Sequence, residues 1–436
     1  MNRKIFGLFL FVSLIVVFGL MACSNKTDGG SEEDSDKITV TFWHSMSGEN
    51  GTNFEEIVEE FNNQSDNVHI EPVYQGSYTD LITKIRAMGN TDEAPAIIQA
   101  SGTNRKYLAE SDFVEPMQKF IDEEDFDTSQ LEENALNRYV IDDTLYSMPF
   151  STSNAVMYYN KDLFKEAGLD PDNPPQTFSE IEDAAQKIKN ATGNYGFTMA
   201  TIGWYFEQLL ANQGELYLDN DNGFSGEPTK SLVNEEAGQM IFQWLDNMNK
   251  AETFKNYGSD WEDPRAPFLA GQVGIYFDSS ANTREMVKQA PFEIATAPLP
   301  VPDGVEPHGA TVGGNSNYIT NKVSEEEQKA AWEFIKYTVS PEVQAKWASV
   351  TGYFPVTKAA NEEDVLKETY DEFPQMLTAV EVNNKTPAEP AMSGPLSDDG
   401  EQFRSIIEAA QEKVYEGEDP KKALDEAAEK INDLLN

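Results

Sequence analysis

The sequence predicts an α/β protein with two α/β lobes around a central cleft. From residue 37 onward, segments with the alternation of a β-strand are followed by segments whose apolar residues recur at helical spacing. The 436-residue chain is also longer than one hydrophobic core usually supports. A polar turn over 147–154, punctuated by Pro149, leads directly into a new strand and indicates a crossing between the lobes.

The first part of the chain alternates strands and helices. The expected elements are, in order, a strand over 38–43, a helix over 53–62, a strand over 69–73, a helix over 78–88 and a strand over 96–99. This alternation is typical of a parallel sheet covered by helices. Residues 43–45 and 76–78 follow two of the strands, and open α/β sheets place their ligands at such strand ends.

The remainder of the chain continues the pattern and then becomes mainly helical. We expect strands over 155–160, 274–277 and 292–297, and helices over 161–167, 204–213, 235–249, 325–339, 341–350, 400–415 and 420–435. A further helix begins at a cap formed by Thr177 or Ser179, and Asp419 caps the last one.

Three crossings between the lobes are expected, near Phe150, Asp278 and Asn317. They assign residues 38–150 plus 281–317 to the first lobe. Residues 151–280 plus 318–436 then form the second lobe.

The N-terminal segment has the composition of an export signal. Two basic residues and a long apolar run precede Cys23, the only cysteine of the chain. This arrangement resembles a bacterial lipoprotein signal peptide, whose cleavage leaves a cysteine that carries lipid. The apolar run is also long enough to span a membrane, but the position of the single cysteine favours the lipoprotein interpretation. We therefore expect a signal peptide over 1–22, lipidation of Cys23, and a flexible linker over 23–37 that holds an exported protein on the outer face of the cell membrane.

The charge of the chain excludes several classes of partner. Removal of Arg3 and Lys4 with the signal leaves 30 of the 32 basic residues against 76 acidic ones, a net charge of about −46. Such a surface repels nucleic acids and anionic lipid headgroups, so contact with the membrane is expected through the lipid alone. A single cysteine permits no intramolecular disulfide, and the fold must therefore depend on its core.

Several stretches occur in an order that matches a known family over nearly all of the mature chain. They are Val40–Met46 (VTFWHSM), Tyr74–Tyr78 (YQGSY), Ala94–Gln99 (APAIIQ), Tyr158–Asp162 (YYNKD), Ala167–Pro171 (AGLDP) and Thr351–Ala360 (TGYFPVTKAA). Together they resemble the extracellular solute-binding proteins of ABC importers, and within that group the branch that binds sn-glycerol 3-phosphate.

The resemblance implies a periplasmic-binding-protein-like fold whose lobes close around a ligand. It further implies a protein that is not an enzyme. Such a protein captures a polyhydroxylated solute, which is glycerol 3-phosphate, a glycerophosphodiester or a sugar, and presents it to the transmembrane subunits of an ABC permease. We expect a monomer without a cofactor.

The family's ligand-binding positions fall on six residues: Tyr78, Ser153, Trp204, Ser280, Gly314 and Tyr353. Ser279 is a neighbouring alternative to Ser280, and Tyr353 is expected to come from the second lobe. These residue types suit a polyol, because hydroxyl and amide groups hydrogen-bond to its OH groups while an aromatic face covers its CH surface.

Three positions depart from the family pattern. The acidic contact falls on Gly102, a second tryptophan on Thr201, and the arginine that would hold the phosphate on Leu396. A phosphate in a protein of this charge would be poorly compensated without a cation. The site therefore uses another base, for which Arg105, Arg284 and Arg404 are the candidates, or the ligand is a larger phosphodiester or a neutral sugar.

Simpler interpretations compete with these assignments. Trp244, Trp332 and Trp347 lie in helical apolar patterns and are expected in the core, whereas Trp43 and His44 fit either the core or the cleft. A secreted carbohydrate hydrolase is the alternative function, because two carboxylates in a cleft can cut glycosidic bonds. With 76 acidic residues such a pair carries little information, and the sequence contains neither a G-x-S-x-G nor an H-E-x-x-H motif nor a pattern of metal ligands.

Overall fold

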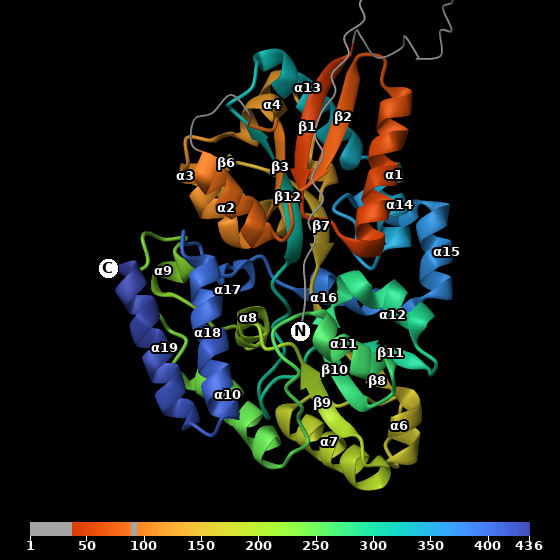
Figure 1. The fold of residues 1–436 in the computed structure, drawn as a ribbon, viewed down its shortest axis with the longest axis vertical. Helices are drawn as coiled ribbons and strands as arrows, with labels where there is room; N and C mark the ends of the chain where they lie inside the picture. Colours follow the sequence, from red (N-terminus) through yellow and green to blue (C-terminus); the bar gives the residue numbers. More distant parts are fainter. Residues whose placement is uncertain (1–36, 89–93) are drawn as a thin grey trace, which may run out of the picture. The chain divides into compact units, whose positions relative to one another are not determined.

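The computed structural model describes residues 37–88 and 94–436, which form two lobes, each built on its own β-sheet (Figure 1). The predicted signal peptide, Cys23 and nearly all of the predicted linker lie outside the described residues. Over the described ranges, no helix is both long enough and apolar enough to cross a bilayer.

The first lobe contains a six-stranded mixed sheet in the order β2-β1-β3-β12-β4, with β7 also paired to β12. The strands are β1 (Ile38–His44), β2 (Val68–Tyr74), β3 (Ile97–Ser101), β4 (Val114–Glu115), β7 (Met148–Ser153) and β12 (Gly313–Thr320). β1 is parallel to β2 and β3, whereas β12 is antiparallel to β3, β4 and β7. The three strands predicted before residue 100 are therefore confirmed.

Helices cover the first sheet, and a small hairpin lies beside them. The helices are α1 (Gly48–Gln64), α2 (Tyr78–Met88), α3 (Arg105–Glu110), α4 (Met117–Glu124), α5 (Glu133–Asn137), α13 (Glu325–Thr338), α14 (Pro341–Val350) and α15 (Asp364–Glu372); the hairpin is β5 (Val140–Ile141) and β6 (Thr144–Leu145). Phe42 of β1 packs edge-on against Phe54 of α1 and Phe334 of α13. Trp332 and Trp347 are fully buried in this core, as predicted.

The second lobe contains a four-stranded sheet in the order β11-β8-β10-β9. Its strands are β8 (Ala155–Asn160), β9 (Tyr195–Met199), β10 (Val273–Ser279) and β11 (Ile294–Ala297). Its helices are α6 (Lys161–Glu166), α7 (Phe178–Thr192), α8 (Gly203–Ala211), the short α9 (Asp219–Asn222), α10 (Glu236–Lys250), α11 (Glu262–Leu269), α12 (Thr283–Gln289), α16 (Leu377–Lys385), α17 (Pro390–Ser393), α18 (Gly400–Tyr415) and α19 (Pro420–Leu435). Thr177 caps α7 in a capping box with Glu180, and Asp419 caps α19, so both cap predictions are confirmed.

The structure corrects the expected division between the lobes. β10 and β11 both pair antiparallel with β8, so the chain does not cross at Asp278, and residues 281–297 remain with the second sheet. Conversely, α13, α14 and the last three residues of β12 belong to the first lobe, although residues 318–436 were assigned to the second. The predicted lobe boundaries failed because similar polar residues follow a strand in both cases. The local sequence does not distinguish a chain that crosses to the other lobe from one that turns into a helix of the same lobe.

The chain crosses between the lobes at three places. The first crossing separates β7 from β8 at Asn154, close to the one predicted at Phe150. The second lies between β11 and β12, just before the position expected at Asn317, and the third lies between α15 and a short helix at Pro374–Met376 that contacts β11. Three crossings can act together as a hinge between the two sheets.

Candidate ligand-binding site

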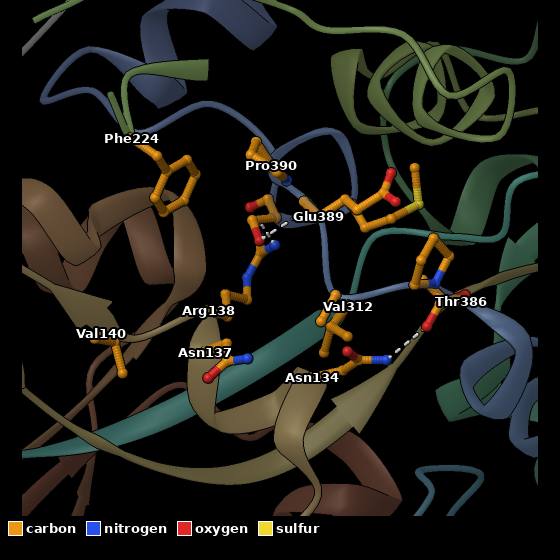
Figure 2. A pocket seen from close by; sticks show the side chains of 13 residues that line it. Asn134, Asn137, Arg138, Val140, Phe224, Val312, Thr386, Glu389 and Pro390 are labelled. Atoms are coloured by element: carbon orange, nitrogen blue, oxygen red, sulfur yellow. Dashed lines mark hydrogen bonds between the residues drawn. The ribbon is translucent and has the colours of Figure 1, made fainter. Parts of the chain in front are cut away.

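A cavity of about 660 Å³ lies between the lobes and is lined by residues of both. The residues that line it include Ser45, Tyr78, Gly102, Thr103, Arg138, Ser153, Trp204, Asp260, Trp261, Glu262, Arg265, Ser279, Asn282, Gly314, Tyr353 and Arg404. Five of the six residues expected to bind the ligand are therefore brought together here, and Ser280 is the exception. A side cavity of about 260 Å³ lies beside this cleft and shares Arg138 with it (Figure 2).

Tyr78 reaches the cavity because α2 begins there. Gly76 adopts the left-handed region at φ +91°, where a Cβ would lie 2.7 Å from the Asp80 carboxylate. The Ser77 backbone N–H and its hydroxyl donate to Asp80 Oδ2 at 2.9 and 2.8 Å, and the Asp80 N–H donates to the Ser77 hydroxyl. These bonds satisfy free N–H groups at the start of the helix and fix Tyr78 at the strand exit.

Tyr78 and Tyr353 present protonated hydroxyl groups. Asn315 Nδ2 donates to Tyr78 Oη at 3.0 Å, which leaves the phenolic proton free for another acceptor. Burial of the hydroxyl, together with nearby Tyr353, raises the pKa of Tyr78 well above its ordinary value. Burial also raises the pKa of Tyr353 to about 12. Both hydroxyls can therefore donate hydrogen bonds over the whole physiological pH range.

The ring of Tyr353 stacks on Trp347 of α14, with centroids 5.7 Å apart and planes inclined by 14°. It packs against the core of the first lobe. The expectation that this tyrosine comes from the second lobe is therefore wrong. Tyr353 follows α14 directly in the chain, and α14 belongs to the first lobe.

Ser153, Gly314 and Trp204 converge where the two lobes meet. A Cβ at Gly313 would lie 3.0 Å from Ser153 Oγ and 3.3 Å from Trp204 Cζ2, so these two side chains flank the same backbone. Gly314 has φ +96°, and a Cβ there would lie 1.9 Å from the Ser151 carbonyl oxygen. Glycine is thus required where β12 pairs with β7, and the bare backbone of Gly314 borders the cavity.

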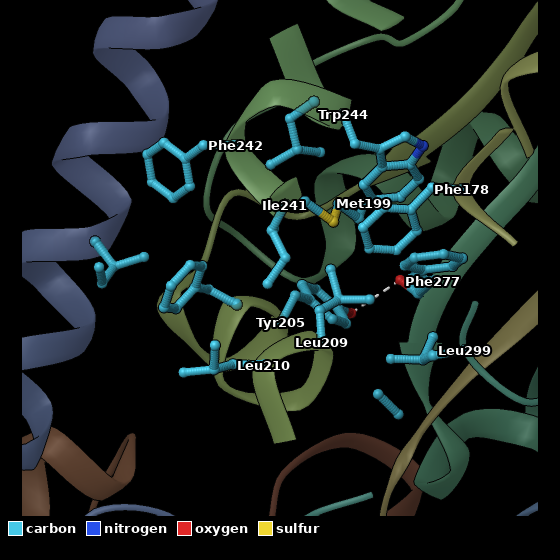
Figure 3. Packing of buried hydrophobic residues seen from close by; sticks show 14 of the residues in the cluster. Phe178, Met199, Tyr205, Leu209, Leu210, Ile241, Phe242, Trp244, Phe277 and Leu299 are labelled. Atoms are coloured by element: carbon cyan, nitrogen blue, oxygen red, sulfur yellow. Dashed lines mark hydrogen bonds between the residues drawn. The ribbon is translucent and has the colours of Figure 1, made fainter. Parts of the chain in front are cut away.

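Trp204 stands at the start of α8, a helix whose residues are all buried in the core of the second lobe. Tyr205, the next residue, donates from its hydroxyl to the Phe277 carbonyl oxygen at 2.8 Å and packs among apolar side chains that include Leu209 (Figure 3). Trp244 lies in the same cluster, as predicted. A rigid helix therefore holds Trp204 at the cleft.

The cavity contains a second tryptophan that sequence reasoning missed. Thr201, on which the family position falls, is buried and donates to Asn256 Oδ1, and it does not line the cavity. Trp261, just before α11, lies instead with its ring centroid 5.5 Å from that of Trp204 and is 38% exposed. The sequence could have indicated this residue. Trp261 stands in the acidic stretch Ser259–Asp263 without an apolar pattern around it, which argues against a place in the core.

The serine pair after β10 has two different environments. The buried hydroxyl of Ser280 accepts from the Asn154 N–H at 3.3 Å, and the Ser280 N–H donates to the Asn154 carbonyl oxygen at 2.9 Å. Ser280, directly after β10, is thus hydrogen-bonded to Asn154 at the first crossing between the lobes. Ser279 lines the cavity instead. The ligand contact stays a prediction, and the geometry favours the alternative, Ser279.

Of the three arginines considered from the sequence, Arg105, Arg284 and Arg404, one reaches the cavity, and Leu396, on which the family's arginine falls, does not. Leu396 is buried outside the lining, Arg105 is buried among backbone carbonyl groups, and Arg284 lies over the Phe373 ring. Arg404 of α18 does line the cavity, where its Nε and Nη2 donate to Glu207 Oε2 at 3.0 and 2.7 Å.

The two undecided residues at the end of β1 do not line the cavity. His44 is 1% exposed and packs against Phe54 at a centroid distance of 4.9 Å, and burial lowers its pKa to about 4. Trp43 packs against a smaller apolar cluster behind α2. Their neighbour Ser45 faces the cavity instead.

Comparison with known proteins identifies the family. A family described as bacterial extracellular solute-binding protein matches residues 56–432. The sn-glycerol-3-phosphate-binding periplasmic protein UgpB of Yersinia pseudotuberculosis serotype I is 30% identical over 404 residues, which cover 91% of this chain and 92% of the relative. UgpB of Escherichia coli strain K12 is 30% identical over 405 residues, with the same coverage of both chains.

Solved structures agree in fold. UgpB from Mycobacterium tuberculosis in complex with glycerophosphocholine superposes with a TM-score of 0.78 at 21% identity and covers 92% of this chain and 98% of that one. The cyclic α-maltosyl-1,6-maltose-binding protein from Arthrobacter globiformis gives 0.74 at 24% identity and covers 92% and 99%. At this identity the structures show a shared two-lobed fold. With the family match over most of the chain and relatives at 30% identity, the chain belongs to the bacterial extracellular solute-binding proteins and has a solute-binding role in an ABC importer.

Proposed function

We propose that the solute is polyhydroxylated and carries a phosphate group, of the glycerol 3-phosphate or glycerophosphodiester type. The observation that supports this proposal is the composition of one cavity: the rings of Trp204 and Trp261, the hydroxyls of Tyr78 and Tyr353, and the guanidinium of Arg404. Aromatic rings cover CH surface, hydroxyls hydrogen-bond to a polyol, and a guanidinium binds phosphate oxygens. The relatives named for sn-glycerol 3-phosphate agree with this ligand class.

Both lobes line the cavity, so a bound solute would contact both and favour the closed arrangement. Taking the closed form from about 1% to about 99% requires the ligand to bind it more tightly by roughly 5.5 kcal/mol. Contacts from a single lobe would be made equally in the open form and would contribute nothing to closure. The closed protein then presents the solute to the transmembrane subunits of the permease.

We also propose that the solute leaves unchanged, as from a receptor rather than a hydrolase. Carboxylates do border the cavity, but Glu262 is paired with Arg265 at 2.7 Å, and the relatives named above are binding proteins. For the location of the protein, we propose that a lipid on Cys23, as the lipoprotein-like N-terminal segment predicts, holds a monomeric receptor beside its permease.

A ligand panel tests the proposed solute. The thermal unfolding midpoint of the mature protein is measured with sn-glycerol 3-phosphate, glycerophosphocholine, glycerol and maltose. A ligand at 100 times its Kd stabilises the folded state by about 2.7 kcal/mol, so we expect a higher midpoint with at least one of the two phosphates. A shift with maltose alone would replace the phosphate class by a neutral sugar, and no shift with any member would refute the proposed solute.

A further inference from the structure

Arg138 is a buried cation on the wall of the cleft. It follows α5, is 4% exposed, and lines both the cleft and the side cavity (Figure 2). Its Nη1 donates to the Ser393 carbonyl oxygen at 2.9 Å, whereas its Nε, although buried, has no hydrogen-bond partner among the described residues. A buried N–H without a partner is unfavourable and is expected to find an acceptor, here at the edge of the cavity.

The guanidinium of Arg138 occupies the space that a side chain at residue 102 would need. A Cβ built on Gly102 would lie 2.2 Å from Arg138 Nε and 2.8 Å from both Cζ and Nη2. Gly102 is the position at which the family resemblance leads one to expect an acidic ligand contact. In this chain a positive charge therefore stands where a negative one was expected.

The surroundings of Arg138 do not neutralise this charge. Arg105 lies close by, and its guanidinium donates to four carbonyl oxygens, those of Gly102, Ser393, Gly394 and Pro395, at 2.7 to 3.1 Å. Burial, and next the positive charge of Arg138, lower the pKa of Arg105 to about 9.

Neither of these arginines forms an ion pair with a carboxylate within the described residues. Glu207, whose charge acts on Arg105, is itself bound by Arg404. Glu207 lies near both guanidinium groups but hydrogen-bonds to neither, so these two buried cations lack a direct carboxylate partner in the described part of a chain whose formal net charge is −44.

We propose that Arg138 is a ligand-binding and specificity-determining residue whose guanidinium takes an anionic group of the solute, so that the cleft selects anionic over neutral polyols. The assignment rests on the proposed function above and deepens it. Arg404 also borders the cavity, but its guanidinium is paired with Glu207, whereas Arg138 has no hydrogen bond to a carboxylate of the described residues and is the group that discriminates between anionic and neutral ligands. The bound anion supplies the acceptor that Nε lacks and the counter-charge that the two arginines lack.

The test measures affinities of the full mature protein by calorimetry with sn-glycerol 3-phosphate, glycerophosphocholine and maltose. Arg138→Met keeps the length of the side chain and removes its charge, and we expect a loss of about 10- to 100-fold in affinity for the phosphates. Arg138→Lys retains the charge and should recover much of that loss. Arg86→Met removes an exposed charge of α2 that does not line the cleft, and it should leave all affinities unchanged.

A second variant keeps the test decisive if Arg138→Met folds poorly. Gly102→Ala retains both arginines but displaces the guanidinium, and it should also weaken binding of the phosphates. Full phosphate affinity in Arg138→Met would overturn the role of Arg138 and leave the proposed solute intact. A wild-type protein that prefers maltose would overturn both the role of Arg138 and the phosphate class of the solute. A wild-type protein that binds none of the three would instead refute the proposed function.

Discussion

At the scale of single residues, Trp261 offers the cleanest probe of the cleft. Trp204 is part of the core of the second lobe, so its removal would change stability and binding together. Trp261 is 38% exposed, and Trp261→Ala should cost the unliganded protein less than about 1 kcal/mol. It should weaken solute binding by about 5- to 30-fold, because one aromatic face over the solute is lost. Calorimetry and the unfolding midpoint measure the two effects separately.

The matched control for Trp261 is Tyr195→Ala. Tyr195 is 37% exposed and lies at the start of β9, whereas the cleft borders the end of the neighbouring β10. Its removal should leave affinity unchanged. If Trp261→Ala behaved in the same way, the tryptophan pair would not be a binding surface.

The residues of the cleft differ in how far the sequence could predict them. Tyr78, Ser153, Trp204, Gly314 and Tyr353 match family positions, and the structure brings all five to one cavity. Arg138 and Trp261 were not predicted, because each reaches the cavity from an element other than the one that carries the family position. A compensation of this kind depends on packing between distant segments, and no local pattern encodes it.

At the scale of elements, the pairing of β12 with β7 depends on Gly314. Gly314→Ala would place a methyl group against the Ser151 carbonyl oxygen and hold a left-handed backbone that alanine disfavours. The backbone strain costs about 1–3 kcal/mol, and the overlap adds about as much again. We expect a correspondingly lower free energy of unfolding in urea, together with weaker solute binding.

Gly304→Ala separates strain from overlap. Gly304 is also left-handed, at φ +81°, but a Cβ there would meet nothing within 4 Å. This variant should lose only the strain energy and keep its affinity. Equal losses in the two variants would mean that the pairing of β12 with β7 tolerates a side chain at residue 314.

Prediction also succeeded unevenly among the elements. Periodicity and capping residues identified α7, α13, α14, α18 and α19, because these signals are local. The sheet to which a segment belongs is decided by pairing across more than a hundred residues, as between β8 and β10. The lobe boundaries therefore could not be read from the same signals.

At the scale of the whole molecule, the prediction concerns the N-terminus. Mass spectrometry of the protein isolated from membranes should find a chain that begins at Cys23 and carries the added mass of lipid. Cys23→Ala should release the protein from the membrane fraction and leave solute affinity unchanged, because the cleft lies entirely within residues 37–436. A chain that still begins at Met1 would refute the lipid anchor alone.

The position of β12 in the first sheet also constrains the order of folding. β12 lies between β3 and β4, yet it is synthesised about 200 residues after them. Until it arrives, β3 and β4 have open edges, and the apolar face that Phe334 and Trp332 later cover is bare. Contacts so distant in sequence form slowly. The first lobe therefore cannot be completed before residue 313 has been synthesised, which leaves its sheet incomplete while a protein destined for the cell exterior is exported.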